Sequence, residues 1–277
     1  MNAQFSDLPE KSPEVDLAEL LEAGCHFGHQ KVKWNPKMGE WIYVEKDGIH
    51  IFDLVKTASQ LKKAYDAAYM LGAEGKSLVF VGTKRQARDL IQTAATSCGA
   101  SYILSRWLGG LLTNWTQVRK SLKKMIKIEE GLESGAYKGY TKYERVQLEK
   151  EMNKLKRFFQ GIRNLSQMPD CLFVIDTVRE DIAVTEAQIT GVPIIGICDS
   201  NSNPDDIDVV IPANDDARKS IELIVNFVAA GYAAGKLSKA TGKKAASKKE
   251  VLTPKEAEAV AEAETLIVEK VKEEKGE

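Results

Sequence analysis

The chain has 277 residues, enough to bury a core in one large domain or two modest ones. With 43% hydrophobic and 29% charged residues it reads as a globular protein, and no apolar run approaches the length that spans a bilayer, which argues against a membrane partner. The acidic N-terminus lacks a signal-peptide core, which favours a cytoplasmic location, and four widely spaced cysteines favour free thiols over a disulfide framework.

The net charge of −1 hides a strong segregation of charge along the chain. Residues 31–110 carry twelve Lys/Arg against seven Asp/Glu, and residues 118–163 carry thirteen against six. Residues 165–216 carry one Arg against eleven acidic residues. We expect a polyanion to meet the basic first half and middle, with the acidic stretch facing solvent or a protein partner. The alternative is that these charges only solvate helices.

The first quarter of the chain predicts loose and short elements. Residues 1–16 are polar and expected to be loose, and residues 17–30 begin as a short helix that breaks at Gly24. Residues 41–54 predict two short strands around Lys46-Asp47-Gly48, because Asp-Gly favours a hairpin turn. Apolar residues at helical spacing predict a helix over 57–72.

Strand and helix patterns then alternate. Apolar runs predict buried strands, and amphipathic segments between and after them predict helices, the last of which would have Asn214 or Asp215 as its N-cap. This order predicts an α/β fold with a doubly wound, mainly parallel sheet. The expected strands are 77–82, 100–104, 171–177, 192–200 and 208–212, and the expected helices are 84–97, 179–190 and 215–234.

The middle of the chain interrupts this alternation. Apolar residues spaced by three and four, on both sides of a Gly-rich turn at 131–140, predict an antiparallel coiled-coil helical hairpin inserted over 111–165. The core domain would comprise 17–110 and 166–235, and the charged tail 236–277 is expected to be disordered. The hairpin could alternatively serve a soluble scaffold as a partner-binding arm.

The segment RWLGGLLTN (106–114) is the most informative stretch. Arg106 and Trp107 offer a charge and a flat ring, which suit phosphates and stacked bases, and Asn114 can cap the helix that follows. On this hypothesis, alanine at position 106 or 107 spares folding, whereas Gly109→Val damages it. The alternative is a tight turn with a buried Trp.

Two further segments suggest contact with nucleic acid. KVKWNPKMGEWIY (31–43) interleaves lysines with Trp34 and Trp41, although both tryptophans could belong to the core. Lys84 and Arg85 follow a strand and are expected to reach phosphates. A nucleotide loop at Gly82 is the weaker interpretation, because neither a Walker pattern nor GxGxxG occurs.

Histidines and aspartates suggest a second possibility. His26 and His29, with Asp199, Asp215 and Asp216, could gather a divalent ion at one edge of the sheet, although hydrogen-bonded structural histidines are more common. We therefore assign no metal and no cofactor. The competing function is an α/β enzyme with a site near His29 and Asp199. No GxSxG nucleophile motif supports it.

The motifs LLEAGCHFGHQ, KWNPKM, LVFVGTKRQA, RWLGGLLTNW, PDCLFVIDT and NSNPDDIDVVIPANDDA together resemble the bacterial S-two family, the second protein of the small ribosomal subunit. The resemblance covers residues 17–235. It implies a flavodoxin-like domain with an inserted coiled-coil hairpin, and a ribosome-bound, non-enzymatic structural role in translation without a small-molecule substrate. The implied partners are small-subunit ribosomal RNA and neighbouring ribosomal proteins, among them the large mRNA-binding first protein where the organism has it. Matching motif positions imply RNA contact for Lys33, Trp34, Asn35, Lys37, Lys84, Arg85, Arg106, Trp107 and Asn114.

Overall fold

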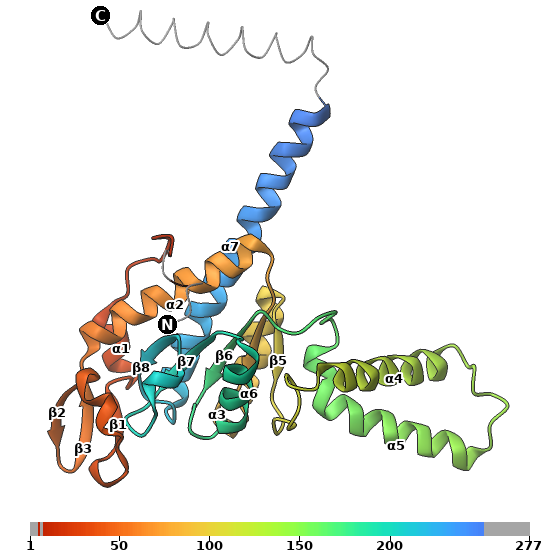
Figure 1. Cartoon of the computed structure of the whole chain (residues 1–277), viewed down its shortest axis with the longest axis horizontal. Coiled ribbons are helices and arrows are strands. Elements are labelled where there is room, and N and C mark those ends of the chain that lie inside the picture. The colour runs from red at the N-terminus through yellow and green to blue at the C-terminus, as the bar shows by residue number, and fades with distance from the viewer. Residues whose placement is uncertain (1–4, 6–7, 252–277) are drawn as a thin grey trace, which may run out of the picture. The chain divides into compact units, whose positions relative to one another are not determined.

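A computed structural model describes Phe5 and residues 8–251 of the chain. Its centre is a five-stranded parallel sheet with the strand order β5-β4-β6-β7-β8 (Figure 1). All five strands lie within the predicted segments, and four of them are buried along their whole length, as expected for apolar strands covered on both faces. The strands are β4 (Leu78–Val81), β5 (Ser101–Ile103), β6 (Cys171–Ile175), β7 (Ile194–Cys198) and β8 (Val209–Pro212).

Helices cover both faces of this sheet, which confirms a doubly wound α/β arrangement. Alternate residues of β4 point to opposite sides: Leu78 and Phe80 join one core cluster, and Val79 and Val81 join the other. The first cluster also contains residues of α2, α3 and α7, and the second contains residues of α6 and of the inserted helices. The helices are α2 (Leu54–Glu74), α3 (Arg85–Cys98), α6 (Asp181–Thr190) and α7 (Arg218–Val251). The four cysteines are buried and unpaired, as predicted.

A small antiparallel sheet, with the order β1-β3-β2, precedes the parallel sheet in the chain. Its strands β2 (Ile42–Lys46) and β3 (Ile49–Phe52) form the predicted hairpin, and both turn residues, Asp47 and Gly48, have positive φ, as a two-residue turn requires. Strand β1 (Phe27–Gln30) was not predicted, because four residues containing a glycine, a histidine and a glutamine show no alternating pattern. Helix α1 (Leu17–Glu22) ends before Gly24, as expected.

Two residues of the polar N-terminal segment contact helix α2. The backbone N–H of Lys11 and the hydroxyl of Ser12 both donate to the carboxylate of Asp66 in α2. The buried carboxylate lies 55 residues away, so local sequence does not reveal these contacts. Residues 1–4, 6 and 7 lie outside the described residues, and looseness of residues 1–16 stays a prediction.

The insertion consists of two helices side by side, α4 (Trp115–Glu133) and α5 (Lys142–Phe159) (Figure 1). Val118, Leu122 and Met125 of α4 are buried, and Lys156 of α5 forms an ion pair with Glu129 of α4 at 2.6 Å. A capping box at Thr141 and Glu144 starts α5. Short helices η2 (Lys31–Lys33), η3 (Pro36–Trp41), η4 (Gln160–Ile162) and η5 (Pro204–Asp206) complete the elements.

The C-terminal part of the chain forms a separate unit from Leu237 onward. Helix α7 continues as far as Val251, so the first part of the tail is helical, and residues 252–277 lie outside the described residues. Disorder of the tail beyond Val251 stays a prediction. Among the described residues, no helix has the length and apolarity that crossing a membrane would require.

Candidate functional site

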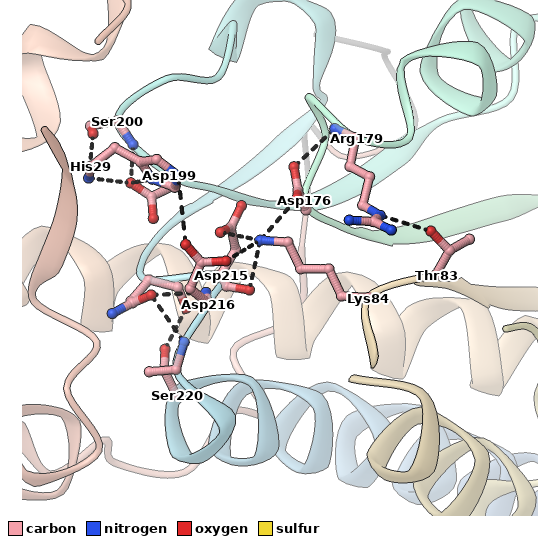
Figure 2. Close-up of polar contacts among 12 residues, drawn as sticks. His29, Thr83, Lys84, Asp176, Arg179, Asp199, Ser200, Asp215, Asp216 and Ser220 are labelled. Carbon is pink, nitrogen blue, oxygen red and sulfur yellow. Dashed lines mark hydrogen bonds and ion pairs between the residues drawn. The ribbon is translucent and has the colours of Figure 1, made fainter. Parts of the chain in front are cut away.

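The carboxyl ends of four parallel strands bring charged side chains together. Lys84 follows β4, Asp176 follows β6, Asp199 follows β7 and Asp215 follows β8. Because parallel strands end at the same edge of a sheet, residues that are far apart in the chain meet here. Figure 2 shows this cluster, which His29 of the antiparallel sheet completes.

Lys84 is the buried centre of the cluster. Its Nζ lies 2.8 Å from Asp176 Oδ2, 2.7 Å from Asp215 Oδ1 and 2.6 Å from Asp216 Oδ1, and the residue is only 7% exposed (Figure 2). Burial alone would lower the pKa of Lys84, but the three carboxylates outweigh burial and raise it. The expectation that Lys84 reaches RNA phosphates is therefore wrong for this structure, because its charge is used inside the protein.

His29 connects the two sheets. Its Nδ1 lies 2.9 Å from Asp199 Oδ1 and its Nε2 lies 3.6 Å from Asp216 Oδ2. Its backbone N–H also donates to Asp199 Oδ1 and to the hydroxyl of Ser200. The hydrogen bond to Asp199 raises the pKa of His29 against the opposing effect of burial. When both ring nitrogens of His29 carry a proton, Nδ1 faces Asp199 and Nε2 faces Asp216, so the charged imidazole meets two carboxylates.

Asp215 is the most deeply buried acidic residue of the cluster. It is completely buried, and its Oδ2 has no hydrogen-bond partner among the described residues. Burial, followed by the nearby charges of Asp176 and Asp199, raises its pKa to about 7, although Lys84 acts in the opposite direction. At neutral pH this carboxyl is thus poised between its neutral and charged forms.

The cluster offers the types of ligand atom that a divalent cation binds, an imidazole nitrogen and carboxylate oxygens. His29, Asp199 and Asp215 each offer one ligand atom, and these atoms all lie within 4.8 Å of one another. His26 is not part of this set, although the sequence placed it beside His29. Lys84 already supplies a positive charge to Asp215. The carboxylates can therefore be neutralised by the lysine alone or by the lysine together with a bound cation.

We expect Asp215→Asn to weaken the dependence of stability on pH. Between about pH 4 and pH 7 the folded carboxyl keeps a proton that the unfolded chain releases, so stability falls as pH rises through this window. His29 acts in the same direction, because its pKa is also raised. The wild type should be more stable near pH 5 than near pH 8 by on the order of 2 kcal/mol from Asp215.

Urea unfolding at both pH values, with a chelator present so that no cation holds the carboxylates, measures this difference. The exposed Asp89 of α3 provides the control variant Asp89→Asn, which should keep the wild-type pH dependence. An Asp215→Asn protein with an unchanged pH dependence would show that Asp215 is fully ionised well below neutral pH.

The segment 106–114 encloses a buried carboxylate. Glu186 of α6 accepts hydrogen bonds from Trp107 Nε1 at 3.2 Å and from the backbone N–H groups of Gly110, Leu112 and Thr113 at 2.6 to 3.2 Å. Burial would raise the pKa of Glu186, but these N–H donors outweigh it and lower the pKa. No signal in the sequence marks Glu186, because its partners lie more than 70 residues away.

Trp107 belongs to the core. It is 3% exposed and packs in the second core cluster, so the expected contact of its ring with RNA bases is wrong for this structure. The alternative of a tight turn with a buried Trp is confirmed. Trp107→Ala should consequently destabilise the protein, by about 3–5 kcal/mol, instead of sparing its folding.

The two adjacent glycines have different roles from those expected. Gly110 has a φ of +85°, a conformation that side chains disfavour, whereas a Cβ at Gly109 would meet nothing within 4 Å. The damage to folding that was predicted for Gly109→Val is therefore expected for Gly110→Val instead. Asn114 occupies the N-cap position of α4, but its side chain makes no capping hydrogen bond.

The other seven residues expected to contact RNA are not enclosed in the core. Lys33, Arg85 and Arg106 are exposed, Trp34 is 36% exposed with its ring edge against His50, and Asn35 is half-buried. The four residues from Lys33 to Lys37 form one segment, while the remaining three, Arg85, Arg106 and Asn114, lie on other elements. Lys37 pairs with Asp205 at 2.5 Å.

The acidic stretch faces outward less than its sequence suggests. Of its eleven acidic residues, five are buried, and most of their contacts are internal. The expectation that the whole stretch faces solvent or a partner is therefore wrong. The buried residues are Asp176, Glu180, Glu186, Asp199 and Asp215.

Comparison with known proteins identifies the class to which this fold and its charged strand ends belong. Residues 20–235 match the family described as "Ribosomal protein S2". The chain is therefore a ribosomal protein, and it belongs to the ribosomal protein S2 family. Its relatives are named as proteins of the small ribosomal subunit and not as enzymes, so the enzymatic alternative near His29 and Asp199 is not supported.

Three relatives carry the name "Small ribosomal subunit protein uS2". The chain is 48% identical to the protein of Koribacter versatilis over 80% of its own length and 73% of the relative's. It is 46% identical to that of Bdellovibrio bacteriovorus over 80% and 71%, and 48% identical to that of Azorhizobium caulinodans over 78% and 65%.

Proposed function

We propose that this chain is a structural constituent of the small ribosomal subunit that binds small-subunit ribosomal RNA and neighbouring ribosomal proteins during translation. The match of residues 20–235 to the ribosomal protein S2 family carries this proposal, because that range contains both sheets and both inserted helices. The names of the relatives supply the small subunit as the site of assembly. The proposed location is the ribosome in the cytoplasm.

The RNA-binding surface that we propose comprises Lys33, Trp34, Asn35, Lys37, Arg85, Arg106 and Asn114, without Lys84 and Trp107. Exposed cations attract phosphates, and the accessible part of the Trp34 ring can stack on an unpaired base. The backbone N–H of Asn35 donates to the carbonyl of Ser200 at 2.7 Å, which fixes this segment beside the end of β7. A fixed segment presents its charges with little loss of conformational entropy on binding.

The domain organisation fits this role. The strand order of the parallel sheet matches that of flavodoxin-like folds, which supports a core of residues 17–110 and 166–235. The hairpin of 111–165, with its buried α4 stripe and its ion pairs across the helices, supports a short coiled coil that carries positive charge away from the core. Beyond RNA, the proposed protein partners include the large mRNA-binding first protein.

The double variant Lys33→Gln/Arg85→Gln should reduce the salt dependence of RNA binding. Each lost phosphate contact lowers the slope of log K against log salt by roughly one, so we expect a decrease of about two relative to the wild type. Filter binding of the full chain to small-subunit ribosomal RNA at several salt concentrations measures the slope. Lys63→Gln, at an exposed position on α2, is the matched control.

Two results would count against the proposed function. A wild-type chain that binds this RNA no better than an unrelated RNA of equal length would contradict specific binding. A tagged chain that never sediments with small subunits in cell extracts would contradict a structural role in them.

A further inference from the structure

A hollow of about 450 Å³ lies at the carboxyl ends of β4, β5 and β6 and contains three arginines. Arg88 comes from α3, Arg106 follows β5 and Arg179 follows β6, so three separate elements contribute one arginine each. We call this hollow the arginine pocket. It lies where the chain order of the sheet reverses, since β5 lies on one side of β4 and β6 on the other. Ligands of open α/β sheets bind at this kind of position.

Two of the arginines are held in place by one residue. Arg88 Nε donates to the backbone carbonyl of Thr83 at 2.9 Å. Arg179 Nε donates to the Thr83 hydroxyl oxygen at 3.1 Å, as Figure 2 shows. The Thr83 hydroxyl in turn donates to Glu180 at 2.6 Å. Because these bonds use the Nε atoms, the terminal nitrogens of both guanidinium groups stay available to a ligand.

The charge of the pocket favours an anion. None of the ion pairs among the described residues involves Arg88, Arg106 or Arg179. The pocket also contains Glu180 and Asp181. Both carboxylates already accept local hydrogen bonds, Glu180 from Thr83 and Asp181 from the backbone N–H of Ile182. Three cations therefore face two carboxylates that are engaged elsewhere.

We infer that the arginine pocket binds a backbone phosphate of small-subunit ribosomal RNA, with Arg88, Arg106 and Arg179 as donors. This inference rests on the proposed function and adds Arg88 and Arg179 to the RNA-binding surface. The planar guanidinium group donates two parallel hydrogen bonds to phosphate oxygens, and all three arginines are exposed enough to be reached. The held geometry means that little side-chain freedom is lost on binding.

The test uses the full chain and the double variant Arg88→Gln/Arg179→Gln. Binding to small-subunit ribosomal RNA should weaken about tenfold or more, and the salt slope should fall by roughly one, because one phosphate loses its partners. Arg218→Gln, at an exposed arginine at the start of α7, should leave both quantities unchanged. Arg88→Lys/Arg179→Lys keeps the charge and should recover the slope but only part of the affinity.

The outcomes separate this inference from the function on which it rests. If the wild type binds the RNA and the double Gln variant binds it with the same affinity and the same salt slope, the phosphate site in the arginine pocket is overturned and the proposed function is not. Absence of wild-type binding would overturn both. A variant that keeps RNA binding but no longer sediments with small subunits would show that an acidic protein segment occupies the pocket, which also overturns the RNA assignment. If the double variant melts early, the single variant Arg179→Gln, at an exposed residue that the proposed RNA-binding surface does not include, repeats the measurement.

Discussion

Glu186→Ala should lower the free energy of unfolding by about 3–5 kcal/mol, because this side chain of α6 holds the backbone of the 106–114 segment. The carboxylate accepts from one indole N–H, three backbone N–H groups and the hydroxyl of Thr113. Its removal leaves these donors without their acceptor, several of them away from water. Chemical denaturation of the full chain measures the effect.

Glu186→Gln keeps the side-chain volume and changes only the charge and the hydrogen-bonding capacity of the carboxylate. Each oxygen of Glu186 accepts at least two hydrogen bonds, so either orientation of a glutamine amide points its NH₂ group at donors. We therefore expect the Gln variant to be destabilised too, whereas Glu130→Ala, at an exposed position on α4, should be nearly neutral. A Gln variant as stable as the wild type would show that the charge of Glu186 is unimportant.

Lys84→Met should be similarly damaging at neutral pH, with a loss of about 3–5 kcal/mol. The variant keeps most of the side-chain volume but leaves Asp176, Asp215 and Asp216 facing one another without their cation. Part of the loss should be recovered near pH 5, because protonation relieves the repulsion between the carboxylates. Thermal or urea unfolding at both pH values measures this recovery.

Lys63→Met, at an exposed position, should change stability little and serves as the control. The same pair of variants decides between the two roles of Lys84. A Lys84→Met protein of normal stability that no longer binds RNA would contradict the internal role and restore Lys84 to the RNA surface.

The sequence predicted the elements far better than the partners of their polar residues. The runs around Phe80, Phe173 and Ile195 contain enough apolar residues to specify buried strands, and Asp47-Gly48 specifies its turn through backbone preference alone. These properties are local, so a single sequence carries them. The short strand β1 lacks such a pattern, since it exists through pairing with β3.

The sequence predicted which histidine and aspartates lie together in the candidate site, but not which partners the polar side chains bind. Asp199 and Asp215 were correctly grouped, because residues after parallel strands meet at one edge of the sheet. His29 joins them from β1 of the antiparallel sheet. Lys84 and Trp107 were misplaced for a common reason: each binds a carboxylate more than 70 residues away, and local patterns say nothing about such pairs. A Lys or Trp after a strand looks the same in sequence whether its partner is internal or external.

The inserted hairpin is fastened to the body where its chain departs and where it returns. Where the chain departs, Glu186 holds Gly110, Leu112 and Thr113. Where it returns, a Cβ on Gly161 would come within 2.1 Å of the carbonyl oxygen of Tyr102 in β5. The direction of the hairpin is consequently set by α6 and β5 and not by the turn around Gly135, whose φ of +73° restricts the residues that this turn accepts.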